Sequence, residues 1–128
     1  MSSNFKIEYI NENDYNRIFV TSDIHGCYNL FEKLLNKINL KKDDLLIILG
    51  DSCDRGENSI ELYLKYIELQ EQGYLIKHIW GNHEDMLYES AFISSYYKDL
   101  WYKVGGDETV YNYEQYIKKL SERRIKIF

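Results

Sequence analysis

Three short polar segments of this 128-residue chain carry the residue types that bind cations and phosphate. Each of them comes directly after an apolar run: Asp23-Ile24-His25-Gly26, Gly50-Asp51-Ser52-Cys53-Asp54-Arg55-Gly56 and Gly81-Asn82-His83-Glu84. Mixed imidazole and carboxylate ligands suit Mn²⁺, Fe or Zn²⁺ better than Ca²⁺. We therefore expect a metal centre that is assembled from these three segments.

The ligand types within the segments predict two cations, with Mn²⁺ favoured and Fe or Zn²⁺ as the alternatives. Asp23 and His25 alternate with Ile24, so an extended backbone would point both toward one side, where they could chelate one cation. Asp51 could bridge that cation to a second one, to which Asn82 would add a neutral oxygen. Two cations roughly 3.5–4 Å apart would hold a phosphate, lower the pKa of a bridging water and neutralise developing charge.

Further residues of the same segments could act on a bound phosphate. Arg55 could clamp phosphate oxygens through two guanidinium N–H groups. His83 could protonate the leaving oxygen, if Asp54 or a water network holds its tautomer. Glu84 and Asp85, by contrast, are expected simply to serve the N-terminus of the helix that follows.

The pattern between these segments predicts strands that alternate with helices. Strands are expected at 17–22, 45–49 and 74–80, and helices at 30–39, from residue 60 to Gly73, from Asn82 onward and around 113–120. Asp23 and Asp51 lie 28 positions apart, and Asp51 and Asn82 lie 31 apart, which is the length of one βαβ unit. We therefore predict an α/β fold with three or more parallel strands and helices on both faces, whose polar segments meet at one sheet edge.

The remaining chain suggests one domain over residues 17–128, preceded by a tail or an edge strand at residues 1–16. Trp101 and the tyrosines are expected to pack in the core, or to belong to a core that a complete fold would form, and His78 is expected to be a packed or surface histidine. Cys53 is interpreted as filler rather than as a nucleophile. Arg123, Arg124 and Lys126 are expected to form a solvated basic tail.

Composition limits the compartment and the partners. A net charge of −5 disfavours nucleic acid and anionic membranes, and no apolar run approaches the ~20 residues of a membrane helix. Two cysteines in different loops, Cys27 and Cys53, fit a reducing cytosol, and the N-terminus does not resemble a signal peptide. We expect a cytoplasmic protein without nucleic-acid or membrane partners.

The three polar segments resemble those of the calcineurin-like metallophosphoesterases and, more narrowly, of the phosphoprotein phosphatase family of Ser/Thr phosphatases. A later stretch resembles a segment common in bacterial and phage members, through Trp101, Gly105-Gly106, Thr109 and Tyr113. The resemblance covers roughly residues 17–113. It implies the roles that the residue types suggested: Asp23, His25 and Asp51 on a first metal, Asp51 and Asn82 on a second, His83 as general acid supported by Asp54, and Arg55 on phosphate.

The resemblance also implies an activity and a substrate class. It points to a metal-dependent phosphoesterase that hydrolyses phosphomonoesters by two-metal activation of water, acting on phosphoserine or phosphothreonine in proteins or on a small phosphoester. Dinucleoside polyphosphates are the alternative substrate, since related bacterial enzymes cleave those.

Two departures from the family pattern stand out. Trp80 replaces an Arg that usually precedes Gly-Asn-His-Glu, and two later metal-binding histidines and a phosphate-binding Arg have no counterpart after His83. The chain therefore resembles the N-terminal half of the α/β/β/α sandwich. We expect a truncated, degenerate or split protein: a half-site with little activity alone, whose exposed apolar surface favours self-association or a completing polypeptide.

Overall fold

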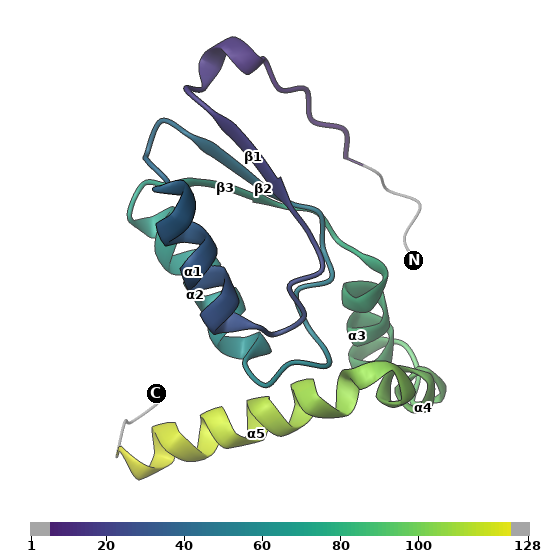
Figure 1. Ribbon diagram of the computed structural model, residues 1–128. Coiled ribbons are helices and arrows are strands. Elements are labelled where there is room, and N and C mark those ends of the chain that lie inside the picture. Colours follow the sequence, from purple (N-terminus) through teal and green to yellow (C-terminus); the bar gives the residue numbers. More distant parts are fainter. Residues whose placement is uncertain (1–5, 124–128) are drawn as a thin grey trace.

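The computed structural model describes residues 6–123 and contains the predicted strands and helices in the predicted order, together with one further α-helix and two short helical segments that were not predicted (Figure 1). Its strands are β1 (Ile18–Thr21), β2 (Leu45–Ile48) and β3 (Leu75–His78). Its α-helices are α1 (Tyr28–Ile38), α2 (Ser59–Glu71), α3 (Asn82–Phe92), α4 (Tyr96–Trp101) and α5 (Asp107–Glu122). A 3₁₀ helix, η1 (Glu12–Asp14), precedes β1, and a π-helical stretch, η2 (Tyr102–Gly106), joins α4 to α5.

The three strands form one parallel sheet in the order β1-β2-β3. Thr21 pairs with Ile48, and Ile48 pairs with His78, so the strands end level with one another. The loops after all three strands therefore start from the same edge of the sheet, which confirms the predicted α/β architecture.

The main core lies between the sheet and the two crossover helices, α1 and α2, which pack together on one face (Figure 1). Its buried members come from both layers: Ile24, Phe31, Leu46, Ile48, Leu62, Tyr66, Leu69 and Ile76. Helix α3 borders the other face, where its Tyr88 and the following Ile93 line a groove of about 1060 Å³ together with Ile47 and Lys77. This second face is more open, and Val20 on β1 is 57% exposed.

An ion pair between the partly exposed Arg17 and the buried Asp44 fixes the start of the sheet. Arg17 donates two hydrogen bonds to Asp44, from Nε at 3.1 Å and from Nη2 at 2.6 Å. The same guanidinium donates to the carbonyl oxygens of Ile38 (3.1 Å) and Asn39 (2.9 Å) at the C-terminal end of α1. The hydrogen bonds from Arg17 hold the pKa of the buried Asp44 carboxyl below its usual value, although burial opposes this shift. Arg17 thus ties β1, α1 and β2 together.

Helix α5 includes the helix predicted around 113–120, and its apolar side chains are not buried: Tyr113 is 55% and Ile117 is 41% exposed. The residues of α5 that are buried are polar, Thr109 and Asn112. Asn112 accepts a hydrogen bond from the backbone N–H of Ile60 (2.8 Å) and donates to the Glu61 carboxylate (2.9 and 3.0 Å). Polar contacts with the start of α2 therefore dock this helix.

Within residues 6–123, no helix combines the length and the apolar character that crossing a membrane demands. Arg123 is exposed at the end of α5. The rest of the expected basic tail, Arg124 and Lys126, and the first five residues of the expected N-terminal tail lie outside the described residues.

Candidate metal and phosphate site

Backbone hydrogen bonds hold the first two polar loops side by side. Beyond the strand ends, the N–H of Asp23 donates to the carbonyl of Gly50 (3.2 Å), and the N–H of His25 donates to the carbonyl of Asp51 (3.1 Å). The third loop approaches so closely that a Cβ atom on Gly81 would lie 2.3 Å from Asp51 Oδ1. Only glycine fits at this position, and the three loops meet as a result.

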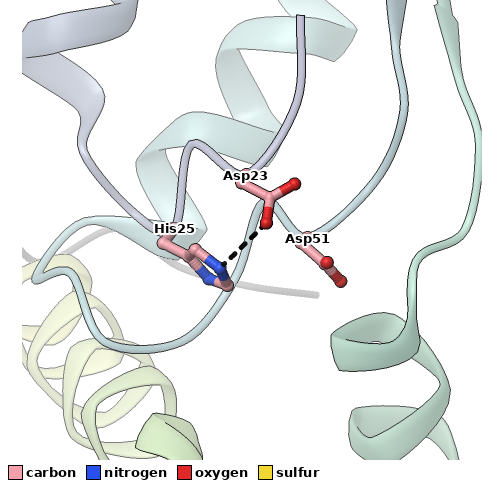
Figure 2. Close-up of side chains that lie close together, drawn as sticks. All are labelled: Asp23, His25 and Asp51. Carbon is pink, nitrogen blue, oxygen red and sulfur yellow. Dashed lines mark ion pairs between the residues drawn. The ribbon is translucent and has the colours of Figure 1, made fainter.

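Three of the predicted metal ligands converge at this edge. Asp23, His25 and Asp51 each offer one ligand atom, and these atoms lie within 4.8 Å of one another (Figure 2). His25 Nδ1 lies 2.8 Å from the carbonyl oxygen of Cys53, which can only accept, so Nδ1 carries the proton. Nε2 therefore presents its lone pair, 3.8 Å from Asp23 Oδ2. A neutral imidazole fixed in this tautomer is the form that binds a metal ion.

The fourth predicted ligand, Asn82, lies against Asp51. One orientation of its amide turns the oxygen toward the Asp51 carboxylate, and the flipped orientation lets the nitrogen donate to Oδ1 at 3.0 Å and Oδ2 at 3.1 Å. Without a cation the flipped orientation satisfies both side chains, because two facing oxygens would repel each other. Two carboxylates, an imidazole nitrogen and an amide oxygen form a donor set that fits a divalent cation. The structure thus brings all four candidates together.

The backbone at this edge has an unusual conformation. Within residues 6–123, six non-glycine residues have φ between 46° and 76°, in the left-handed region. Five of them are candidate site residues: Asp23, His25, Asp51, Asp54 and Arg55. The prediction of an extended backbone at Asp23 and His25 is therefore wrong, although their side chains do lie on one side. Such residues are held in place by their surroundings, which here are the paired loops and the first turn of α3.

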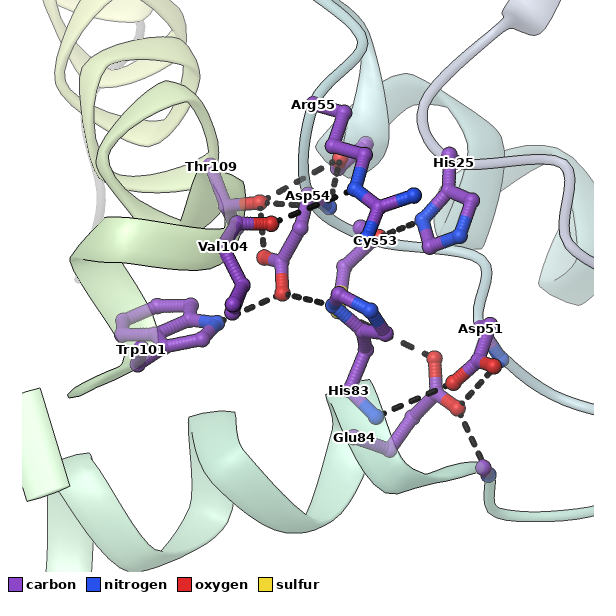
Figure 3. Close-up of polar contacts among 12 residues, drawn as sticks. His25, Asp51, Cys53, Asp54, Arg55, His83, Glu84, Trp101, Val104 and Thr109 are labelled. Carbon is purple, nitrogen blue, oxygen red and sulfur yellow. Dashed lines mark hydrogen bonds and ion pairs between the residues drawn. The ribbon is translucent and has the colours of Figure 1, made fainter.

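The predicted acid and its supporting carboxylate are in direct contact. His83 Nδ1 lies 2.7 Å from Asp54 Oδ2, and both side chains are buried (Figure 3). The ring of His83 also lies edge-on to the ring of His25, with centroids 4.6 Å apart. With Nδ1 occupied by Asp54, Nε2 is the nitrogen that remains for a ligand beside the metal-binding residues.

Arg55 extends from the loop on the side of His25 and His83 (Figure 3). Its Nε donates to the carbonyl of Val104 at 3.3 Å, and the guanidinium is exposed. No other residue in 6–123 accepts from its Nη1 and Nη2 groups. These two nitrogens are therefore available to a phosphate.

Glu84 does more than the predicted service to the N-terminus of α3. It accepts the N–H of Gly81 (2.8 Å), as expected, but also the N–H groups of Asp51 (2.7 Å) and Ser52 (2.9 Å) and the hydroxyl of Tyr63 (2.7 Å). Burial raises the pKa of Glu84, but hydrogen bonds from Tyr63 and these backbone groups outweigh it and lower that pKa overall. The carboxylate therefore joins the second and third loops.

Trp101 and Thr109 were not predicted to touch the site. Trp101 was expected to pack in the core, and it is indeed buried, but its indole N–H also donates to Asp54 (2.6 Å) (Figure 3). The Thr109 hydroxyl donates to the other oxygen of Asp54 (2.7 Å). Apart from the family resemblance, the sequence offers one indication of these contacts, which is that a buried indole and a buried carboxylate each need a hydrogen-bond partner.

Three residues near the site fill structural positions. His78 packs against Tyr63 and Tyr66 and shares a hydrogen bond with Ser52 Oγ (2.8 Å), and burial lowers its pKa. Burial raises the pKa of the Cys53 thiol, which disfavours a nucleophilic role. Trp80, in the position where the resemblance expects an Arg, packs at a tilt against Tyr88 of α3, with ring centroids 5.5 Å apart.

Comparison with known proteins adds independent evidence. The family described as calcineurin-like phosphoesterase matches residues 16–127. "Serine/threonine-protein phosphatase 2" of Salmonella typhimurium is 37% identical over 98 residues, which cover 76% of this chain and 42% of that protein. "Bis(5'-nucleosyl)-tetraphosphatase, symmetrical" of Wigglesworthia glossinidia brevipalpis is 34% identical over 67 residues, which cover 52% of this chain and 24% of that protein. A solved structure of a protein described as a diadenosine tetraphosphatase matches with a TM-score of 0.46 and 24% identity, over 74% of this chain and 40% of that one.

The chain spans about two fifths of the length of the Salmonella relative, 42%. The stretch that matches the family, residues 16–127, nevertheless contains every loop and side chain of the site described above. By the extent of this match, the chain belongs to the calcineurin-like phosphoesterase family.

Proposed function

We propose that this chain is a metal-dependent phosphoesterase that hydrolyses phosphomonoesters, with phosphoserine or phosphothreonine in proteins as its substrate. The supporting observation is that Asp23, His25 and Asp51 converge within 4.8 Å, next to the paired His83 and Asp54. The name of the Salmonella relative supports the substrate class. Two unpaired cysteines support a reducing, cytosolic setting.

Two divalent cations, Mn²⁺ or else Fe or Zn²⁺, would bind this site. Asp23, His25 and Asp51 would hold the first, and Asp51 and Asn82 would hold the second. When bound, the cations supply neutralisation of the phosphate charge and activation of water. The chain's own residues orient and protonate the substrate. The free Nη1 and Nη2 groups of Arg55 bind two phosphate oxygens. In its doubly protonated form, His83 donates a hydrogen bond from Nδ1–H to Asp54 and delivers the Nε2 proton to the leaving oxygen.

The site is open, which suits a phosphate that is carried on a protein surface. The Asp23 side chain is 62% exposed, and Asn82 and Arg55 are exposed as well. An alternative substrate is a dinucleoside polyphosphate, which the name of the Wigglesworthia relative favours. A second alternative is that this stretch alone turns over little, because the second cation would have only Asp51 and Asn82 among the predicted ligands.

The test compares substrates and variants with Mn²⁺ present. Phosphate release would be measured from a phosphothreonine peptide, and cleavage of diadenosine tetraphosphate would be followed by chromatography. We expect Mn²⁺-dependent cleavage of the peptide that is lost in Asp51→Asn and kept in the control Asp43→Asn, whose side chain is exposed in the turn before β2. Mn²⁺ binding would be measured by calorimetry on the same variants.

Each outcome has a distinct meaning. Cleavage of the dinucleotide alone would transfer the proposal to the alternative substrate. Mn²⁺ binding that depends on Asp51, without cleavage of either substrate, would support the half-site alternative. Mn²⁺ binding that is unchanged in Asp51→Asn would refute the metal assignment itself.

A further inference from the structure

The carboxylate of Asp54 is fully buried and is held by residues far along the chain (Figure 3). Trp101 Nε1 donates to Oδ2 at 2.6 Å, and Thr109 Oγ1 donates to Oδ1 at 2.7 Å. The same Thr109 hydroxyl accepts the backbone N–H of Asp54 at 2.9 Å. A buried carboxylate is costly unless donors surround it, and these neutral donors set its orientation toward His83 Nδ1.

The neighbouring Arg55 is held by the same stretch of chain. Its backbone N–H donates to the carbonyl of Gly105 (3.1 Å), and its Nε donates to the carbonyl of Val104 (3.3 Å). Gly105 has φ +108°, and a Cβ atom there would lie 2.6 Å from Arg55 Cγ. At Gly106 a Cβ atom would lie 2.3 Å from the Trp101 ring. The stretch is therefore shaped to fit against Asp54 and Arg55.

We propose that residues 101–109, from the end of α4 through η2 to the start of α5, form a positioning clamp for two adjacent residues with different tasks. Trp101 and Thr109 orient Asp54, and through it they orient the ring of His83. The carbonyls of Val104 and Gly105 direct Arg55. The catalytic consequence rests on the proposed function, whereas the positioning is a property of the free chain.

Substitutions can distinguish a clamp that positions Asp54 from residues that only pack α5 against the site. Trp101→Phe keeps an aromatic ring against Gly106 and removes the N–H group. Thr109→Val keeps the shape of the side chain and removes the hydroxyl, while Thr109→Ser restores the hydroxyl. If these residues only anchor α5, Thr109→Ser and Thr109→Val should differ in stability alone. If they position Asp54, the hydrogen bond from His83 should change in the folded protein.

The direct test is NMR on the free chain labelled with ¹⁵N at histidine, at fixed pH and without metal or substrate. We expect a protected, downfield Nδ1–H signal of His83, identified by its loss in His83→Gln. Its exchange with water should be roughly 10-fold faster in Thr109→Val and in Trp101→Phe, which corresponds to about 1.4 kcal/mol, and unchanged in Thr109→Ser, because each of the first two variants removes one hydrogen bond to the Asp54 carboxylate. A signal that is absent from the wild-type chain, or that exchanges equally in Thr109→Val and Thr109→Ser, overturns the proposal.

Kinetics with the phosphothreonine peptide and Mn²⁺ supply the second readout. In Trp101→Phe and Thr109→Val, kcat should fall by roughly 10- to 100-fold, part of the 10²–10⁴ that general acid catalysis contributes, with KM nearly unchanged. Gly105→Ala, which displaces Arg55, should instead raise KM. An inactive wild-type chain with the expected NMR pattern contradicts the proposed function and supports the clamp. Full activity in the variants with an unchanged His83 signal refutes the clamp and leaves the proposed function standing.

Discussion

Glu84→Gln is the sharpest test of how the loops are held together. In the wild type, one carboxylate oxygen accepts the N–H groups of Asp51 and Gly81, and the other accepts the N–H of Ser52 and the hydroxyl of Tyr63. Glutamine keeps one acceptor oxygen, and its NH₂ group must face the other pair. The Tyr63 hydroxyl can rotate and accept from this group, but the Ser52 N–H is left facing a donor.

The expected loss of stability follows from the hydrogen bonds that Glu84→Gln removes. Losing one hydrogen bond to a charged group costs about 1.5–3 kcal/mol, and a buried N–H without an acceptor costs about 1–3 kcal/mol, with partial overlap between the two. We therefore expect Glu84→Gln to lower the free energy of unfolding by about 2–4 kcal/mol. For a denaturant slope of about 2 kcal/mol/M, the urea midpoint should fall by about 1–2 M.

The assay is urea unfolding followed by circular dichroism, without added metal. Glu71→Gln is the matched control, because Glu71 is exposed at the end of α2 and the same substitution there should change the free energy of unfolding by less than about 0.5 kcal/mol. A double-mutant cycle with Tyr63→Phe would measure the coupling of Glu84 to the Tyr63 hydroxyl. A loss below about 1 kcal/mol for Glu84→Gln would show that the carboxylate does not hold the loops together.

Three further predictions follow from the site and its supports. Mn²⁺ at 100 times its Kd should raise the free energy of unfolding by about 2.7 kcal/mol, and equal stabilisation of Asp23→Asn would contradict the ligand assignment. Arg17 lowers the pKa of Asp44 in the folded protein. The Asp44 carboxylate therefore stabilises the fold above its ordinary pKa of 3.8, and this stabilisation is lost as the pH falls through the lower pKa of the folded state. Acid unfolding below about pH 4 should therefore be less steep in Asp44→Asn, and identical slopes would rule this out. An aromatic disulfide reagent should modify one thiol rapidly, the exposed Cys27, with Cys53 reacting only on unfolding; two fast thiols would disprove this.

The fold and the four metal-ligand candidates were readable from the sequence because their signals are local. Apolar runs of strand length, helical spacing between them and polar residues at each strand end are all contained within short windows. The topology of parallel strands then requires the three loops to share an edge. Asp23, His25, Asp51 and Asn82 consequently lie together in the structure, as their spacing predicted.

The hydrogen bonds that hold the site in place were harder to predict, because they join residues that lie far apart in the sequence. The Trp101–Asp54 hydrogen bond spans 47 positions and the Thr109–Asp54 bond spans 55, and no periodicity marks either pair. The docking of α5 could not be predicted for a similar reason, since Asn112 holds this helix through polar contacts with Glu61, 51 positions away. Hydrogen-bond partners of this kind depend on how elements pack, and a single sequence records only that a buried polar group needs one.

The left-handed backbone at the site has a consequence for laboratory evolution. An L-residue in that region carries a penalty of about 1–2 kcal/mol that glycine escapes, with Asp tolerating it better than His25 or Arg55. A library screened for heat resistance alone should therefore enrich glycine at these two positions, which raises stability and removes the side chains that act on phosphate. The same library screened for phosphate release should retain them, so the two selections would diverge at the same codons.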